Sequence, residues 1–188
     1  VGDMQVAAKF HDTWLTEGVT NGQGLVNFTF DVPHSHPLGL IGITLYFNGS
    51  STLHSTTTVM NQIFVRSPTN LTISTVTDNP VAGESFNVSG TLLSSNGTGI
   101  MDRTGAALPS SLTFSIDGTD SGFQATGGVV NPNGTWSAVI TLGLSFPRGT
   151  HNITASYTPT VNYYGSSSDT GTFDSRGYSL ISILDPAD

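Results

Sequence analysis

The chain has 188 residues, of which 36% are hydrophobic and only 10% charged, and its formal net charge is −8 with no cysteine. Five basic side chains cannot form the patch that nucleic acid or an anionic membrane requires, so neither is expected as a partner. The longest apolar stretch, 38–47, is too short to cross a bilayer, and no membrane insertion of this segment is expected.

Ser and Thr together account for 50 of the 188 residues, so hydroxyl and amide groups must form most of the polar surface. A β-protein with few charges and many hydroxyls is typical of the extracellular space, where attached sugar can supply solubility. Without cysteine, each hydrophobic core must hold by packing alone.

Apolar and polar residues alternate with period two wherever the sequence is periodic, which predicts an all-β fold. One predicted strand covers 26–32, with apolar residues at every second position, and the next runs from Ile41 to Phe47. Asn-Gly and Asp-Gly pairs such as Asp117-Gly118 predict the turns between strands. Further strands are predicted around 71–73, 86–92, 112–116, 136–142 and 153–157. Six or seven short strands per unit fit an immunoglobulin-like β-sandwich of two sheets.

Residues 24–66 are repeated at 134–176 with an offset of about 110 residues, the length of one such sandwich. The match aligns Gly24 with Gly134 and Arg66 with Arg176, and about six extra residues precede the Gly-Ser pair of the second copy. The sequence therefore predicts tandem domains. Residues 67–176 form a complete repeat, 1–66 the C-terminal part of a previous repeat, and 177–188 the opening strand of the next.

The first repeat lacks its opening strands in this sequence, and half a sandwich would expose an apolar face and unpaired strand edges. Two explanations remain open. Either the polypeptide continues upstream, or neighbouring subunits donate strands to one another in a homopolymer. The apolar residues of the candidate donor strand are Tyr178, Leu180, Ile181 and Ile183.

Seven of the twelve asparagines stand in the sequence N-x-[ST], the acceptor for N-linked glycans, against about three expected from the composition. The alternation and the turn pattern place all of them toward solvent, where a glycan needs to be. The predicted glycosylation sites are Asn27, Asn48, Asn70, Asn87, Asn96, Asn133 and Asn152.

Candidate metal ligands are sparse. His34 and His36 share one side of an extended segment but have no third ligand nearby in sequence, and histidines such as His151 are expected in loops on the polar surface. Asp117 and Asp120 resemble the start of a calcium loop without the glutamate and spacing of an EF-hand, so they are calcium candidates only. No nucleophile with a His and acid in a recognisable order is present, and we expect no enzymatic activity and no cofactor.

The segment from Gly149 to Tyr157, followed by an aromatic pair and Ser166-Ser167-Ser168, resembles the closing hairpin of prokaryotic Ig-like repeat domains. In that family a G-x-[HY]-x-[IV]-x-A-x-Y strand leads through a turn and an aromatic residue to a Ser-Ser pair. The segment from Pro37 to Ser51 is similar but more degenerate, with Phe47 at the tyrosine position. The resemblance implies modules of bacterial or archaeal cell-surface proteins, and the density of glycan acceptors favours an archaeal one.

These observations predict a structural extracellular protein whose tandem glycosylated modules build a filament, sheath or surface layer, with strand exchange between subunits as one means of assembly. Two alternatives remain. An adhesin or stalk module would present loops to a carbohydrate or another cell, and an accessory domain of a secreted enzyme would depend on a catalytic module elsewhere.

Overall fold

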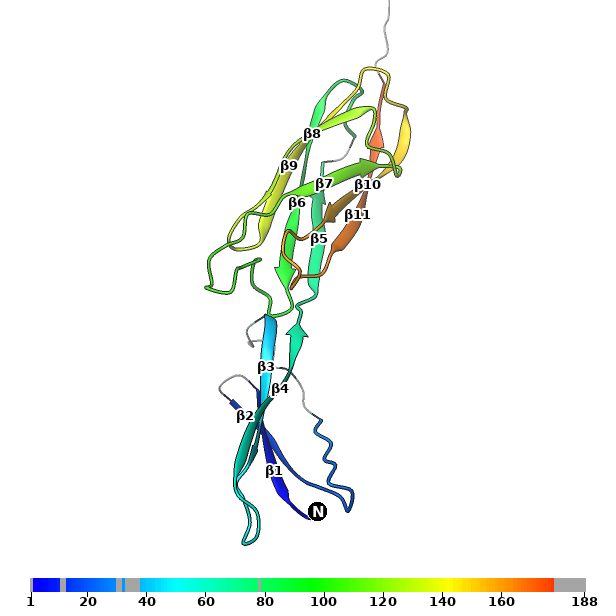
Figure 1. Ribbon diagram of the computed structural model, residues 1–188. Coiled ribbons are helices and arrows are strands. Elements are labelled where there is room, and N and C mark those ends of the chain that lie inside the picture. Colours follow the sequence, from blue (N-terminus) through cyan, green and yellow to red (C-terminus); the bar gives the residue numbers. More distant parts are fainter. Residues whose placement is uncertain (1, 11–12, 30–31, 33–37, 78, 178–188) are drawn as a thin grey trace, which may run out of the picture. The chain divides into compact units, whose positions relative to one another are not determined.

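The computed structural model describes residues 2–10, 13–29, 32, 38–77 and 79–177, and all the regular structure in these ranges is β (Figure 1). The chain divides into two compact units, Val1–Ser67 and Pro68–Asp188. No helix in the described ranges is long and apolar enough to cross a membrane.

The first unit contains one antiparallel sheet of four strands. These are β1 (Gln5–Phe10), β2 (Thr13–Val19), β3 (Gly39–Phe47) and β4 (Thr56–Val65), in the spatial order β2-β1-β3-β4. The buried hydrophobic residues among those described are Ala7, Ala8, Phe10 and Ile41. A single sheet buries few side chains. The last five residues of β3 are only partly buried, whichever face of the sheet their side chains lie on.

The second unit is a sandwich of two antiparallel sheets. One sheet has the order β5-β6-β9-β8 and the other β11-β10-β7. Taken in chain order as A to G, these strands give the ABED and CFG sheets of a constant-type immunoglobulin domain. Their bounds are β5 (Thr69–Val76), β6 (Ser85–Ser94), β7 (Leu112–Ile116), β8 (Phe123–Val130), β9 (Thr135–Leu142), β10 (Gly149–Tyr157) and β11 (Ser167–Ser175).

The core of the sandwich lies between the inward faces of its two sheets. Every second residue of β9 is buried, from Trp136 to Leu142, and β6 has the same alternation over its first half. Aromatic rings join the two layers, since Phe86 of β6 lies 4.8 Å from Phe173 of β11 between ring centroids. Packing of this kind supplies the cohesion that a disulfide gives in many immunoglobulin domains.

Polar contacts close one edge of the sandwich, where β5 and β11 meet. Asp169 accepts a hydrogen bond from the backbone N–H of Ile73 at 2.7 Å, and Thr69 donates from Oγ1 to Ser167 Oγ at 2.8 Å. The Ile73 contact lies where the register of β5 against β6 shifts, so a side chain satisfies a donor near the irregular part of the ladder. These two contacts hold β5, the first strand of the sandwich, against β11, the edge strand of the opposite sheet.

The predicted turn at Asp117-Gly118 is present as a two-residue hairpin. Both residues have positive φ, 50° and 78°, and Ile116 and Thr119 exchange two backbone hydrogen bonds across it. This is the type I′ geometry, which matches the twist of the flanking strands and favours Asp-Gly.

Equivalent strands of the two units pair in the same register. Gly39 faces Val65 as Gly149 faces Ser175, and each pair of positions differs by 110. The third strand also agrees, because Phe47 faces Val6 of β1 as Tyr157 faces Leu112 of β7. The β1–β3–β4 sheet therefore has the pairing of the β7–β10–β11 sheet.

Several sequence predictions about the first unit were wrong. The described part of 26–32 has no strand, although its alternation survives with Val26 and Phe28 partly buried and Asn27 exposed. The corresponding residues of β9 pair with β6 and β8 on either side, whereas the described part of the first unit has no strand equivalent to β6. Backbone without a neighbour cannot form a ladder.

The predicted six-residue difference between the two hairpins was also wrong. The connecting loops, 48–55 and 158–166, differ by one residue. A bulge in β4, opposite the step from Gly42 to Ile43 in β3, adds one residue to β4 and so restores the offset of 110 between β4 and β11. Strands β1, β2 and β8 were not predicted at all, since Gly127 and Gly128 interrupt the pattern of β8 and the short β1–β2 hairpin has few large apolar residues.

Gly90 of β6 is a sensitive position because two groups approach its Cα closely. A Cβ there would overlap the carbonyl oxygen of Thr72 and lie 2.8 Å from Trp136 Cζ2. We expect Gly90→Ala to reduce the free energy of unfolding by about 1–3 kcal/mol, as overpacking does in other cores. Thermal unfolding followed by circular dichroism measures this. Ser137→Ala, on the exposed face of β9, is the control, and equal midpoints for the two variants would contradict the prediction.

Candidate functional site

The described residues hold no cluster of three or more His, Cys, Asp or Glu side chains. The features that carry chemistry are therefore a buried histidine, the asparagines of the glycan acceptors, the polar outer surfaces of the sandwich and two shallow hollows. Each is described by its contacts below.

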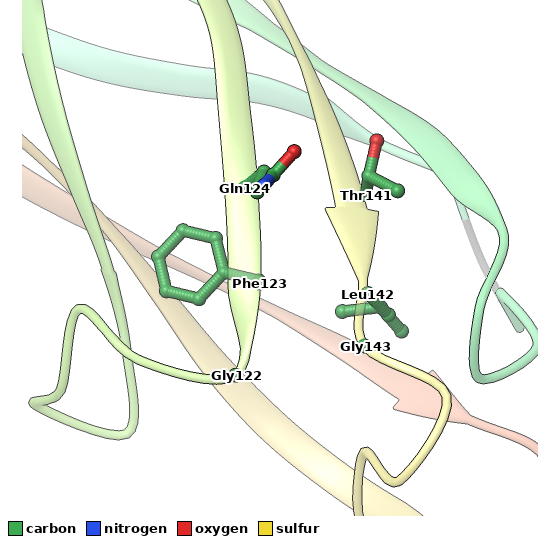
Figure 2. Close-up of a pocket in the computed structure, with 6 residues that line it drawn as sticks. All are labelled: Gly122, Phe123, Gln124, Thr141, Leu142 and Gly143. Atoms are coloured by element: carbon green, nitrogen blue, oxygen red, sulfur yellow. The ribbon is translucent and has the colours of Figure 1, made fainter.

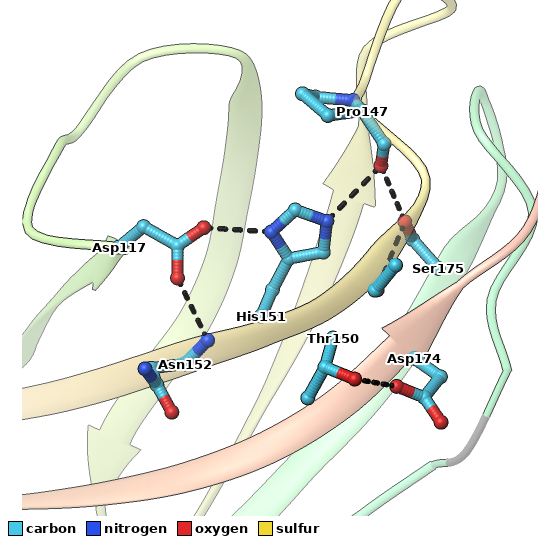
Figure 3. Close-up of polar contacts among 8 residues, drawn as sticks. Asp117, Pro147, Thr150, His151, Asn152, Asp174 and Ser175 are labelled. Carbon is cyan, nitrogen blue, oxygen red and sulfur yellow. Dashed lines mark hydrogen bonds and ion pairs between the residues drawn. The ribbon is translucent and has the colours of Figure 1, made fainter.

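His151 of β10 lies between two hydrogen-bond acceptors (Figure 3). Its Nδ1 is 2.6 Å from Asp117 Oδ2, and its Nε2 is 3.1 Å from the carbonyl oxygen of Pro147. The ring is 7% exposed and meets Phe146 edge-on at 4.8 Å. Both ring nitrogens therefore face an oxygen atom of the protein. The expectation of a loop histidine on the polar surface was wrong for His151.

Asp117 is held by the same group of contacts. Its Oδ1 accepts the backbone N–H of Asn152 at 2.9 Å, and Oδ2 faces the His151 ring. These contacts, with the backbone hydrogen bond the largest and the imidazole next, lower the pKa of Asp117 from its ordinary value. The cluster ties the β7–β8 turn to β10.

The calcium candidates find little support in this arrangement. Both carboxylate oxygens of Asp117 already have nitrogen partners, which an ion would have to displace. Asp120 is exposed in the same turn. Calcium binding at Asp117 and Asp120 stays a prediction. His34 and His36 lie outside the described residues.

All seven asparagines of the predicted glycosylation sites are exposed. Asn70, Asn87 and Asn152 lie on strands with their side chains on the polar parity, and Asn27 and Asn48 lie in connections. Exposure is a requirement for glycosylation, and occupancy stays a prediction.

Asn96 and Asn133 have a further structural role in turns. The Oδ1 atom of Asn96 accepts from both the backbone N–H and the hydroxyl of Thr98, at 3.1 and 2.6 Å. Asn133 makes the same pair of contacts with Thr135 at 3.0 and 2.7 Å. These Asx turns stabilise the two reversals whether or not a sugar is attached.

The outer face of the β7–β10–β11 sheet consists of hydroxyl, amide and carboxylate side chains. Cross-strand pairs bond within it, as Thr154 Oγ1 and Thr170 Oγ1 do at 2.9 Å. No apolar and no basic side chain interrupts this part of the surface. Its residues are Thr113, Ser115, Thr150, Asn152, Thr154, Ser156, Ser168, Thr170, Thr172 and Asp174.

Each unit has a shallow hollow in its described part. In the sandwich a hollow of about 300 Å³ lies between the ends of β8 and β9, where Phe123 and Leu142 are its largest side chains and no lining residue is titratable (Figure 2). In the first unit a hollow of about 270 Å³ has a mostly apolar lining. The residues of this second hollow are Met4, Val6, Thr20, Gly24, Phe47, Leu53 and Thr56.

The aromatic pair that follows β10 is buried. Tyr163 and Tyr164 are 8% and 7% exposed. The hydroxyl of Tyr164 donates to the carbonyl oxygen of Met101 at 2.9 Å and accepts from its N–H at 3.2 Å, so it fastens the loop before β7.

One group of predicted residues lies outside the described structure, and one contact in the structure was not predicted. The candidate donor strand, with Tyr178, Leu180, Ile181 and Ile183, lies outside the described residues. The His151–Asp117 contact was missed because the two residues are distant in sequence, although the position of His151 among the inward residues of its strand could have indicated burial.

Comparisons with known proteins find no matching family model and no curated protein of similar sequence. Among solved structures, domains 4 and 5 of the S-layer protein SbsC are 7% identical over 90% of this chain and 98% of that one, with a TM-score of 0.39. Titin domains z1z2 in complex with telethonin are 11% identical over 94% and 91%, with a TM-score of 0.32. Both are distant similarities, and they carry no conclusion about activity or partners.

Replacing Asp117 with Asn tests the buried cluster while keeping a residue that tolerates positive φ. A carboxyl with a lowered pKa stabilises the fold at pH values above its unfolded pKa, about 3.9, and this contribution is lost as the pH falls through the folded pKa. We expect Asp117→Asn to cost about 1 kcal/mol at pH 7, a modest value because the carboxylate is 46% exposed.

The measurement is the free energy of unfolding of both proteins between pH 7 and pH 2. The difference in the free energy of unfolding between the two proteins should be largest at neutral pH and should shrink below about pH 4. Asp120→Asn, in the same turn, is the control and should leave the profile unchanged. A constant difference across this range would show that the charge of Asp117 does not contribute.

Proposed function

We propose that this chain is a structural extracellular protein whose tandem, glycosylated Ig-like modules of about 110 residues build a filament, sheath or surface layer of a prokaryotic cell. The observation that carries this proposal is the common pairing of the β1–β3–β4 and β7–β10–β11 sheets, whose central strands β3 and β10 correspond at an offset of 110 residues. A module that recurs along one chain suits extended assemblies, in which each unit contacts its neighbours.

The surface of the sandwich also supports a structural role outside the cell. The outer face of the β7–β10–β11 sheet is polar but almost uncharged, and Asn152 stands within it. Glycans on such a face would supply the hydration that the few charged side chains do not. Stability from packing alone suits a chain that has no cysteine.

A non-enzymatic role is consistent with the chemistry of the described residues. His151, which contacts the carboxylate of Asp117, is buried and uses both ring nitrogens in structural contacts. The hollow beside Phe123 has no titratable side chain in its lining. We therefore propose binding and assembly in place of catalysis.

Electron microscopy and intact-mass measurement of the native material test the proposal. We expect repeated assemblies, and a mass above that of the polypeptide, whose 188 residues account for 19.6 kDa. Unmodified monomers of 19.6 kDa would overturn it. Glycosylated monomers would favour the alternative of an adhesin or stalk.

A pair of variants at Ser89 tests glycosylation at one site. Ser89→Ala removes the acceptor sequence of Asn87, whereas Ser89→Thr keeps it, and both changes lie on a partly exposed position of β6. Expressed in the native host, the alanine variant should lose the mass of one glycan and the threonine variant should not. Equal masses for the two would show that Asn87 is unmodified.

A further inference from the structure

The first unit has an apolar sheet face that the described residues cover only in part. We call this the inner face, and it consists of Val6, Ala8, Phe10, Ile41, Ile43, Leu45 and Phe47. Ile43, Leu45 and Phe47 remain partly exposed. Their counterparts in the sandwich, Ile153, Ala155 and Tyr157, are 0%, 0% and 3% exposed.

The cover that exists lies toward one side of the sheet. Val26 and Phe28 are close to Gly18 of β2, since a Cβ on that glycine would lie 2.6 Å from Val26 Cγ2 and 3.1 Å from Phe28 Cε1. Strand β2 is at the opposite edge of the sheet from β4. These contacts leave the β4 side of the inner face without such cover from residues 26–28.

The sandwich shows what covers the equivalent place. There β5 packs along β11, with Thr69 bonded to Ser167 and Ile73 bonded to Asp169. By strand pairing, Ser167 corresponds to Thr56, and Asp169 to Thr58. Thr56 lines the 270 Å³ hollow together with Val6 and Phe47, so the hollow lies where the start of β5 is found in the sandwich.

The sequence after Arg176 has the pattern of β5. At the same offset of 110, Ser179 corresponds to Thr69, Ile181 to Leu71 and Ile183 to Ile73, while Ser182 corresponds to the partly exposed Thr72. Residues 178–188 lie outside the described structure, so this step rests on their sequence alone. Their sequence has apolar residues at Ile181 and Ile183 and a hydroxyl at Ser179, the same kinds of side chain that β5 places against β11.

We propose that residues 178–184 of one chain pack on the β4 side of the inner face of a second copy, with Ile181 and Ile183 against Leu45 and Phe47. This inference rests on the proposed function and names the contact that would join successive chains. The segment buries apolar surface by covering the inner face, as β5 covers β11 from the opposite sheet of the sandwich.

Engineered disulfides test this contact, because the protein has no cysteine of its own. The pair Thr56→Cys and Ser179→Cys reproduces the positions of Ser167 and Thr69, whose hydroxyl oxygens are 2.8 Å apart. The control pair is Thr57→Cys and Ser179→Cys, since Thr57 points to the other face of β4. Mild oxidation of the 188-residue chain should give a ladder of cross-linked multimers with the first pair only.

Two other outcomes would overturn the proposal. A cross-linked monomer would place the segment on its own chain, and absent or equal multimers in both pairs would show no specific contact. A filament seen by electron microscopy without specific cross-links would contradict this contact and would still support the proposed function.

Changes in the donor segment provide an independent measurement. The double variant Ile181→Asp, Ile183→Asp should abolish the multimers of the Thr56–Ser179 cysteine pair, because charged groups cannot be buried against an apolar face. Ser182→Asp has the opposite parity and should leave them. Equal cross-linking in all three proteins would contradict packing through Ile181 and Ile183.

Discussion

The structure depends on one constraint, which is that an apolar sheet face must be covered by another layer. In the sandwich the constraint is met within one unit, where Ile153 and Ala155 are fully buried beneath the opposite sheet. In the first unit the same pairing register occurs with only part of that cover, and Leu45 and Phe47 stay partly exposed. Because hydrophobic burial is the main force that holds such folds, this face gains less stabilisation from the described residues than its counterpart in the sandwich does.

The polar contacts of the sandwich act at the places where packing alone would leave the chain loose. Asp169 satisfies a donor of β5 beside its irregular step, and Asp117 and His151 fasten a tight turn to β10. Tyr164 does the same for the loop at Met101. Of these contacts, the one between Ile73 and Asp169 joins the two sheets, and the other two hold turns and loops in place.

Period-two alternation predicted much of the fold correctly. It located β3, β6, β9 and β10, and together with the turn pattern it predicted the exposure of every glycan acceptor. It failed at 26–32, where Val26 and Phe28 keep the right parity without a ladder. Alternation reports which side chains are buried, whereas a strand also needs a hydrogen-bonding neighbour, and the sequence of the strand itself does not say whether one is there.

The sequence by itself determined the all-β class, the offset of 110 and the solvent-facing asparagines, because each follows from local spacing along the chain. Only the tertiary structure decided that His151 is buried against Asp117, that the two hairpins have nearly equal loops, and that a hollow lies beside Thr56. These depend on which segments meet across the sheets. Contacts between residues distant in sequence depend on which strands pair and on how the core closes. No single stretch of the chain determines either of these.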